Sequence, residues 1–207
     1  MAHLTPLSRE SLPELEDTFS AAGERMGFVP NSLLTMARRP AILKAFAALG
    51  RAINEPNENV PPMLKSMIAH VASSVAGCRY CMAHTASTAD RRASPDEKAK
   101  VERLWAFETD PIFSEKERAA LAFAAAAAAV PNAVEPHHFA QLKRFYSEAD
   151  IVEIASVVAQ FGFLNRWNDS MATELEAEPI AIGQEKLAAR GWTPGKHAGS
   201  EAVTHQA

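Results

Sequence analysis

The sequence predicts an all-α protein, and three observations carry that prediction. Apolar residues recur at three- and four-residue spacing through most of the chain, which is typical of helices with one buried face. Helix-start patterns, in which a serine is followed three residues later by a glutamate, occur several times. No stretch alternates apolar and polar residues as a half-buried strand would. We therefore expect about eight helices and no sheet.

The first quarter of the chain is expected to hold three helices. Ser11 and Glu14 form a capping-box pattern, so the first helix should begin there. Asn31 is expected to cap a short helix over residues 32–38, and Pro40 to start the next one. The apolar stripe of that third helix consists of Ile42, Leu43, Phe46, Leu49 and Ile53.

Both cysteines of the protein lie where the next two predicted helices meet. Pro61 and Pro62 are expected to open a longer helix, because proline is tolerated in a first turn, and Gly77 should end it. Cys78 then stands where a new helix should start. The unpaired N–H groups of a helix start favour a thiolate, so this position suits a reactive cysteine.

Capping boxes place the helices of the second half. Ser94 with Glu97 and Ser114 with Glu117 each predict a helix start. The second leads into an alanine-dense helix over 119–130, and further helices are expected over 137–146 and from 147 onward. From Gly183 the sequence turns polar. We therefore predict a single helical domain over 1–182 and a polar tail over 183–207, either disordered or docked on another subunit.

Composition excludes several classes of protein. The 207 residues carry a formal net charge of -4, which argues against nucleic acid as a partner. No apolar run reaches the roughly 18 residues of a membrane span, and the N-terminus lacks the pattern of a secretory signal. We therefore expect a cytoplasmic protein that does not bind membranes. Its two cysteines would be reduced there, and any disulfide would be transient.

The Cys-x-x-Cys pair, Cys78 and Cys81, allows four chemical interpretations. A thioredoxin-like site needs a strand before the pair, but a helix is predicted there. Covalent haem attachment needs a histidine directly after the second cysteine, where Met82 stands. A zinc site built from the pair with His84 and His70 lacks a second cysteine pair. Dithiol redox chemistry at a helix start is favoured, and two buried thiols that only pack are the remaining alternative.

At this point the sequence resembles a known family. The stretch 77–84 and the helix 64–76 before it resemble the alkylhydroperoxidase AhpD-like group of the carboxymuconolactone decarboxylase family. The segments 27–31 and 163–168 resemble the entry segment and C-terminal helix of its peroxidase-related members, so the similarity covers most of residues 20–178. It implies an AhpD-like, all-helical homo-oligomer, trimeric or hexameric, that reduces hydroperoxides or exchanges electrons with a dithiol partner.

The resemblance also implies roles for individual residues. Cys81 would be the peroxidatic cysteine, and Cys78 the more exposed partner that closes the disulfide. The family's proton relay uses a glutamate and a histidine at positions that here hold Ser66 and Thr85. Neither hydroxyl titrates near neutral pH, so His84, one residue earlier, is a candidate substitute. An offset of one residue turns a helical side chain by about 100°, and a histidine on the helix surface or at an interface is the alternative.

Two further residues, Tyr80 and His70, are expected to bind substrate. The alternatives are core packing for Tyr80 and a hydrogen-bonded core or interface position for His70. Trp167 and Asn168 are expected to pack and hydrogen-bond structurally. We expect no metal and no cofactor.

The function that the sequence favours is that of a thiol-dependent antioxidant enzyme. Its Cys78/Cys81 pair would reduce hydroperoxides, with a dithiol as electron donor, either as a peroxidase with peroxiredoxin activity or as a disulfide reductase. One alternative is a lyase of the lactone decarboxylase type, which would not need the paired cysteines. The other is a non-enzymatic redox-sensing or binding module on the same fold.

Overall fold

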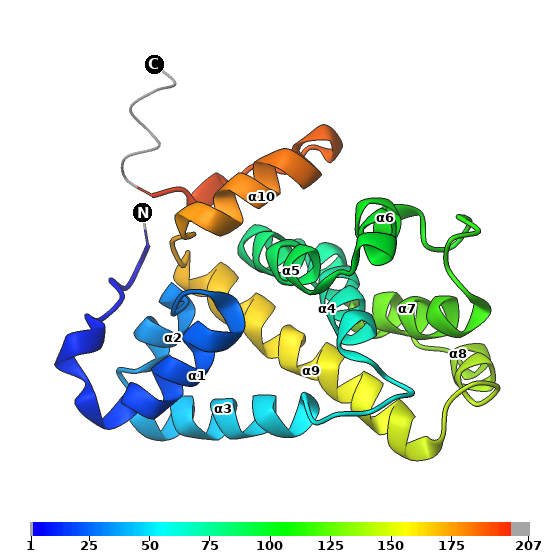
Figure 1. Cartoon of the computed structure of the whole chain (residues 1–207), viewed down its shortest axis with the longest axis horizontal. Coiled ribbons are helices and arrows are strands. Elements are labelled where there is room, and N and C mark those ends of the chain that lie inside the picture. Colours follow the sequence, from blue (N-terminus) through cyan, green and yellow to red (C-terminus); the bar gives the residue numbers. More distant parts are fainter. Residues whose placement is uncertain (1, 200–207) are drawn as a thin grey trace.

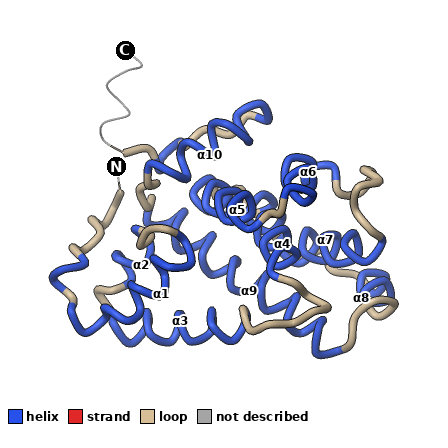
Figure 2. The backbone as a smooth tube through the Cα atoms, viewed as in Figure 1, coloured by secondary structure: helices blue, strands red, loops and turns tan. Residues whose placement is uncertain are grey.

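The computed structural model describes residues 2–199, and within that range the chain forms ten α-helices and no strand (Figures 1 and 2). This confirms the all-α prediction, with more helices than the eight or so expected. The helices run Glu16–Met26 (α1), Asn31–Met36 (α2), Pro40–Ile53 (α3), Pro62–Val75 (α4), Arg79–Arg92 (α5), Pro95–Arg103 (α6), Glu115–Ala128 (α7), Pro136–Leu142 (α8), Glu148–Met171 (α9) and Ala177–Leu187 (α10). None of these ten has the length and apolar character needed to cross a lipid bilayer.

Helix α4 forms the centre of the molecule. It packs against α5, α7 and α9, and nearly every residue from Met63 to Ser73 is buried (Figure 1). A helix that is buried on nearly every side has small or apolar residues on most of its faces, and α4 has Ala69 and Ala72 among its buried residues. Ile68 of α4, Leu121 of α7 and Ile154 of α9 meet in the main hydrophobic core.

Local signals for helix starts are confirmed in the second half of the chain. Ser94, Ser114 and Ser147 each form a capping box at the start of α6, α7 and α9. Gly77 adopts a left-handed backbone with a φ of 70°, which ends the α4 segment, and Cys78 is the N-cap residue of α5. The predicted placement of the cysteine pair at a helix start is therefore confirmed.

Two predictions near the N-terminus are wrong. The first helix begins at Glu16 rather than at Ser11, which lies in a short 3-10 turn where its hydroxyl donates to the carbonyl of Ser8. Asn31 does not cap α2, because Pro30 occupies the cap position and Asn31 is the first helical residue. Its side chain instead donates to the carbonyl of Glu174, so a long-range contact has replaced the local one.

The C-terminal region continues the fold past residue 182. A boundary after that residue would fall inside α10, which packs along α5. Residues 188–199, which we call the C-terminal strap, follow α10 and return to the start of α5. Trp192 and His197 of the strap are only 4% and 1% exposed, so it is part of the packed structure. The rest of the predicted tail, residues 200–207, lies outside the described residues.

Substitution of Gly183 by alanine is expected to lower the free energy of unfolding by about 1–3 kcal/mol. A Cβ atom there would lie 2.5 Å from the ring of Trp192, so the strap would have to move away from α10. The matched control is Gly23→Ala in α1, where no atom of the described residues lies within 4 Å of the added carbon. That variant should be neutral or gain about 0.5–1 kcal/mol. Urea denaturation of both variants checks the prediction, which equal effects would contradict.

Candidate active site

The two cysteines lie in one turn of backbone at the start of α5. Both are free thiols, and they are 1% (Cys78) and 2% (Cys81) exposed. Leu175 and Trp192 pack around them in a small apolar cluster, and Trp192 donates its ring N–H to the carbonyl of Arg79, 3.1 Å away. Because the strap covers the helix start, Cys78 is not the more exposed partner that the resemblance implied.

The environments of the two sulfurs push their pKa values apart. A hydrogen bond from the Cys81 thiol lowers the pKa of Cys78, as do the backbone N–H groups at the helix start. The backbone N–H of Cys81 donates to the Cys78 sulfur at 3.4 Å. Burial raises the pKa of Cys81, because a thiolate there would lose its water. In the resting pair the shared proton therefore lies on Cys81, and Cys78 carries the negative charge when the pair ionises.

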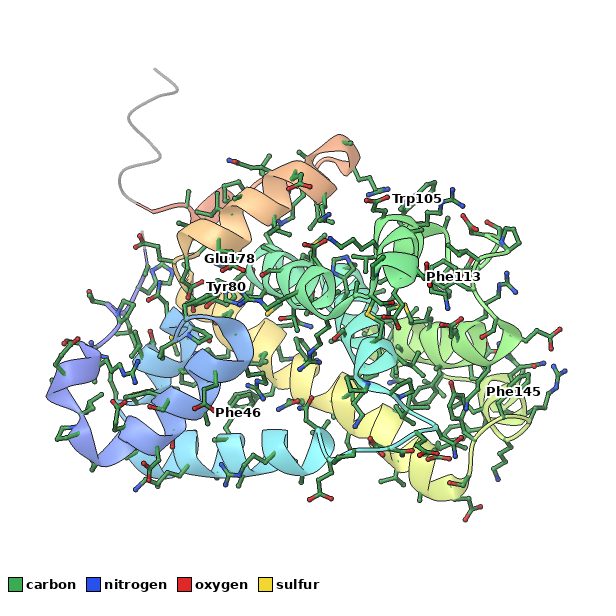
Figure 3. The ribbon with its side chains drawn as sticks, viewed as in Figure 1. Phe46, Tyr80, Trp105, Phe113, Phe145 and Glu178 are labelled. Carbon is green, nitrogen blue, oxygen red and sulfur yellow. The ribbon has the colours of Figure 1, made fainter. Side chains whose placement is uncertain are left out.

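Cys81, but not Cys78, lines a cavity of about 130 Å³. Its walls come from α1, α2, α3, α4, α5 and α9, and most of its inner surface is apolar. Phe46 of α3, labelled in Figure 3, and Leu164 of α9 are among the apolar residues facing it. An apolar cavity of similar size accommodates a benzene molecule, so this one fits a single small ring.

A carboxylate from outside α5 joins the site. Glu176, just before α10, lies 2.7 Å from the Nε2 atom of His84 and accepts a hydrogen bond of 3.1 Å from the hydroxyl of Tyr80. The rings of Tyr80 and His84 stack with centroids 4.2 Å apart. Although burial alone would raise the pKa of Glu176, the charge and hydrogen bond of His84 and the backbone N–H of Asn31 lower it. Glu176 is therefore a carboxylate that holds Tyr80 and His84 at the wall of the cavity.

Asn168 of α9 contacts the sulfur of Cys81 directly. Its side-chain amide N–H donates to the Cys81 Sγ atom at 3.5 Å, and this hydrogen bond opposes the rise in the pKa of Cys81. The role expected for Asn168 was purely structural, but the fold brings it into contact with the site.

Replacing Asn168 by leucine is expected to slow alkylation of Cys81 at neutral pH several-fold. Loss of the N–H donor removes a group that favours the thiolate, so the pKa of Cys81 should rise further. The measurement is the pH dependence of iodoacetamide labelling, read by mass spectrometry of the Cys81 peptide in a Cys78→Ser background. An unchanged pH profile would show that the amide does not act on the sulfur.

The remaining predicted residues separate into two groups. Tyr80 and His84 line the cavity beside Cys81, whereas His70 does not. The Nδ1 atom of His70 lies 2.9 Å from the Thr85 hydroxyl, and burial lowers the pKa of His70 to about 4. At neutral pH it is therefore an uncharged, half-buried residue hydrogen-bonded to Thr85, and it does not line the cavity. The Thr85 hydroxyl also donates to the carbonyl of Cys81, 2.7 Å away.

Sequence reasoning missed Glu176 altogether. It lies 92 positions from His84 along the chain, in a segment with no motif of its own. A single buried carboxylate carries no periodic or spacing signal, and only the packing of α10 on α5 brings it to the site.

Comparisons with known proteins identify the family and the fold. The model of the carboxymuconolactone decarboxylase family matches residues 40–126. The crystal structure of the debrominase Bmp8 without ligand is 41% identical, with 87% of this chain and 96% of that chain covered and a TM-score of 0.82. A cysteine-to-alanine variant of Bmp8 in complex with 2,3,4-tribromopyrrole is 40% identical, with 87% and 95% covered and a TM-score of 0.83.

A peroxidase-related protein from Silicibacter sp. TM1040 is more distant. It is 25% identical over 85% of this chain and 90% of that chain, with a TM-score of 0.69. No curated protein sequence matches this chain significantly. The similarity to Bmp8 extends over most of both chains. The chain therefore belongs to the carboxymuconolactone decarboxylase family and has its AhpD-like fold.

Proposed function

We propose that this protein is a dithiol reductase that removes a halogen atom from a small aromatic ring. The observation that carries the proposal is the position of the two sulfurs. Cys81 faces an apolar cavity of the size of one ring, and Cys78 lies directly behind it, outside the cavity. The substrate can thus contact the sulfur of Cys81 while the sulfur of Cys78 lies within hydrogen-bond distance of it. The similarity to Bmp8, a debrominase that binds a brominated pyrrole, supports this choice of substrate.

The two cysteines supply both electrons and the proton that this reaction needs. The proton shared by the thiols moves to Cys78, and the Cys81 thiolate attacks the halogen atom. A sulfur–halogen bond forms, the carbon–halogen bond breaks, and the ring carbon keeps the electron pair and takes the shared proton. The Cys78 thiolate then attacks the Cys81 sulfur and releases halide. The two sulfurs have supplied two electrons and end as a disulfide, which a dithiol donor must reduce before the next cycle.

The nature of the leaving group favours halide over peroxide chemistry. Bromide is a very weak base and leaves sulfur without a proton. Reduction of a hydroperoxide produces a sulfenic acid, from which hydroxide must leave with the help of an acid. Ser66 and Thr85 occupy the relay positions of the peroxidases, and neither supplies a proton near neutral pH. The residues at these positions therefore suit the reaction that does not need a relay.

Hydroperoxide reduction is the second candidate, and one observation favours it. His84 lines the cavity next to Cys81 and is paired with Glu176, so a titratable group stands near the place where the leaving oxygen would accept its proton. In this version Cys81 is the peroxidatic cysteine and Cys78 resolves the sulfenic acid. The electron donor is again a dithiol.

One assay separates the candidates. Fully reduced protein is mixed without added thiol with a panel of brominated pyrroles that includes 2,3,4-tribromopyrrole, and in parallel with cumene hydroperoxide. We expect one bromide ion for each disulfide formed, followed by ion chromatography and thiol titration. Disulfide formation with the hydroperoxide alone would select the second candidate. Intact thiols in both arms would refute both and favour a lyase or a binding module.

A further inference from the structure

The cavity next to Cys81 has a charged end that the proposed chemistry does not use. Arg25 of α1 and Arg92 of α5 both line it. Arg25 is an exposed residue and Arg92 is half-buried, so they mark the side of the cavity that meets solvent. The rest of the lining is mostly apolar.

Among residues 2–199 neither arginine has a carboxylate within ion-pair distance. Arg92 donates to the hydroxyl of Ser66 at 3.0 Å, a neutral acceptor, and the structure gives Arg25 no hydrogen-bond partner from its side chain. Neighbouring cations differ in this respect. Arg91 is paired with Glu178, and Lys65 with Glu153. Of the lysines and arginines that line the cavity, only these two have no carboxylate partner among the described residues.

The two guanidinium groups are also close enough to repel each other. Partial burial lowers the pKa of Arg92, and the charge of Arg25 lowers it further. Arginine stays protonated throughout the physiological range, so the pair remains doubly positive. Holding two like charges together costs free energy that an anion between them would recover.

We propose that Arg25 and Arg92 bind a carboxylate at one end of an elongated substrate, whose ring fills the cavity against Cys81 and whose chain extends to the solvent side. The choice of ring rests on the proposed function, but the carboxylate site rests on the two arginines alone. Guanidinium groups bind carboxylates through paired, charge-assisted hydrogen bonds, which are stronger than neutral ones. Ser66, at the position where the peroxidases carry a glutamate, keeps a competing negative charge away from Arg92.

The distance along α5 between Cys81 and Arg92 determines how long the ligand must be. Cys81, Thr85, Thr88 and Arg92 follow one another along the cavity side of α5. Eleven residues of helix separate the first and last Cα atoms by about 16 Å, and a helical side chain points back towards the N-terminus, which shortens the gap. A ring at Cys81 and a carboxylate at Arg92 are therefore separated by a few carbon atoms.

The test measures binding without reaction. Reduced wild-type protein is titrated calorimetrically with benzoate, phenylacetate, 3-phenylpropanoate and 4-phenylbutanoate, and with the matching primary amides. We expect the longer acids to bind about tenfold more tightly than their amides, and more weakly as salt is added. Arg25→Gln and Arg92→Gln should each remove this preference while leaving amide binding unchanged. Arg91→Gln is the matched control, because Arg91 is adjacent in sequence but does not line the cavity.

Equal affinity for acid and amide in the wild-type protein would overturn the inference. So would variants that lose affinity for both ligands alike, since that pattern would mean a damaged cavity rather than a lost charge. Because none of these ligands carries a halogen, the preference for acids can hold even if bromopyrroles are not reduced. The two proposals therefore fail separately.

Discussion

Cys81→Ser is expected to lower bromide release from a brominated pyrrole by at least about 10³-fold. A serine hydroxyl does not ionise near neutral pH, and a serine cannot form the disulfide with Cys78 in which the proposed reaction ends. The change is small in volume and lies beside a cavity, so the fold should be retained. Bromide release in the presence of dithiothreitol, with circular dichroism to verify the fold, provides the measurement.

Cys78→Ser is the matched variant, because both cysteines lie in the same turn and are equally buried. It retains the sulfur that faces the cavity but loses the one that completes the cycle. We expect bromide release to depend on an added small thiol, with a mixed disulfide at Cys81 visible by mass spectrometry. If the two variants were indistinguishable, or if Cys81→Ser kept the parent rate, Cys81 would not be the sulfur that attacks.

Glu176→Gln is expected to lower the free energy of unfolding by about 2–3 kcal/mol at neutral pH. The carboxylate accepts from the backbone N–H of Asn31 at 2.5 Å and from the Tyr80 hydroxyl, and it pairs with His84. An amide has only one acceptor oxygen, so one of these buried donors would lose its partner. Denaturant unfolding at several pH values measures the difference.

The same substitution should show a defined pH dependence. Folding lowers the pKa of Glu176 from its ordinary 4.5, so its stabilising effect is fully present above that pH. It is lost as the pH falls through the lower, folded-state pKa, and the difference between parent and variant should shrink in acid. Glu178→Gln is the control, since its ion pair with Arg91 is largely exposed and should contribute less than about 1 kcal/mol. A Glu176 effect no larger than the control, or one that grows in acid, would contradict the assigned charge.

Much of the scaffold around the site is encoded locally. The capping boxes at Ser94, Ser114 and Ser147 and the prolines that open α3 and α4 act within one helical turn, and each is found where the sequence predicts it. Gly77 followed by Cys78 places the thiol pair at the start of α5 for the same reason. A helix start predicted from local sequence was wrong where a residue distant in the chain provided another hydrogen-bond partner. Asn31 donates to the carbonyl of Glu174, before α10, instead of capping α2.

The sequence by itself therefore determined the helical fold, the family resemblance and the dithiol at a helix start. Only the tertiary structure decided what surrounds the sulfurs. Glu176 beside His84, Asn168 on Cys81 and the Arg25–Arg92 pair all join residues that are far apart in the chain. Such contacts depend on how α1, α9 and α10 pack against α5, and packing is set by the shapes of many side chains at once. No spacing rule within a single segment contains that information.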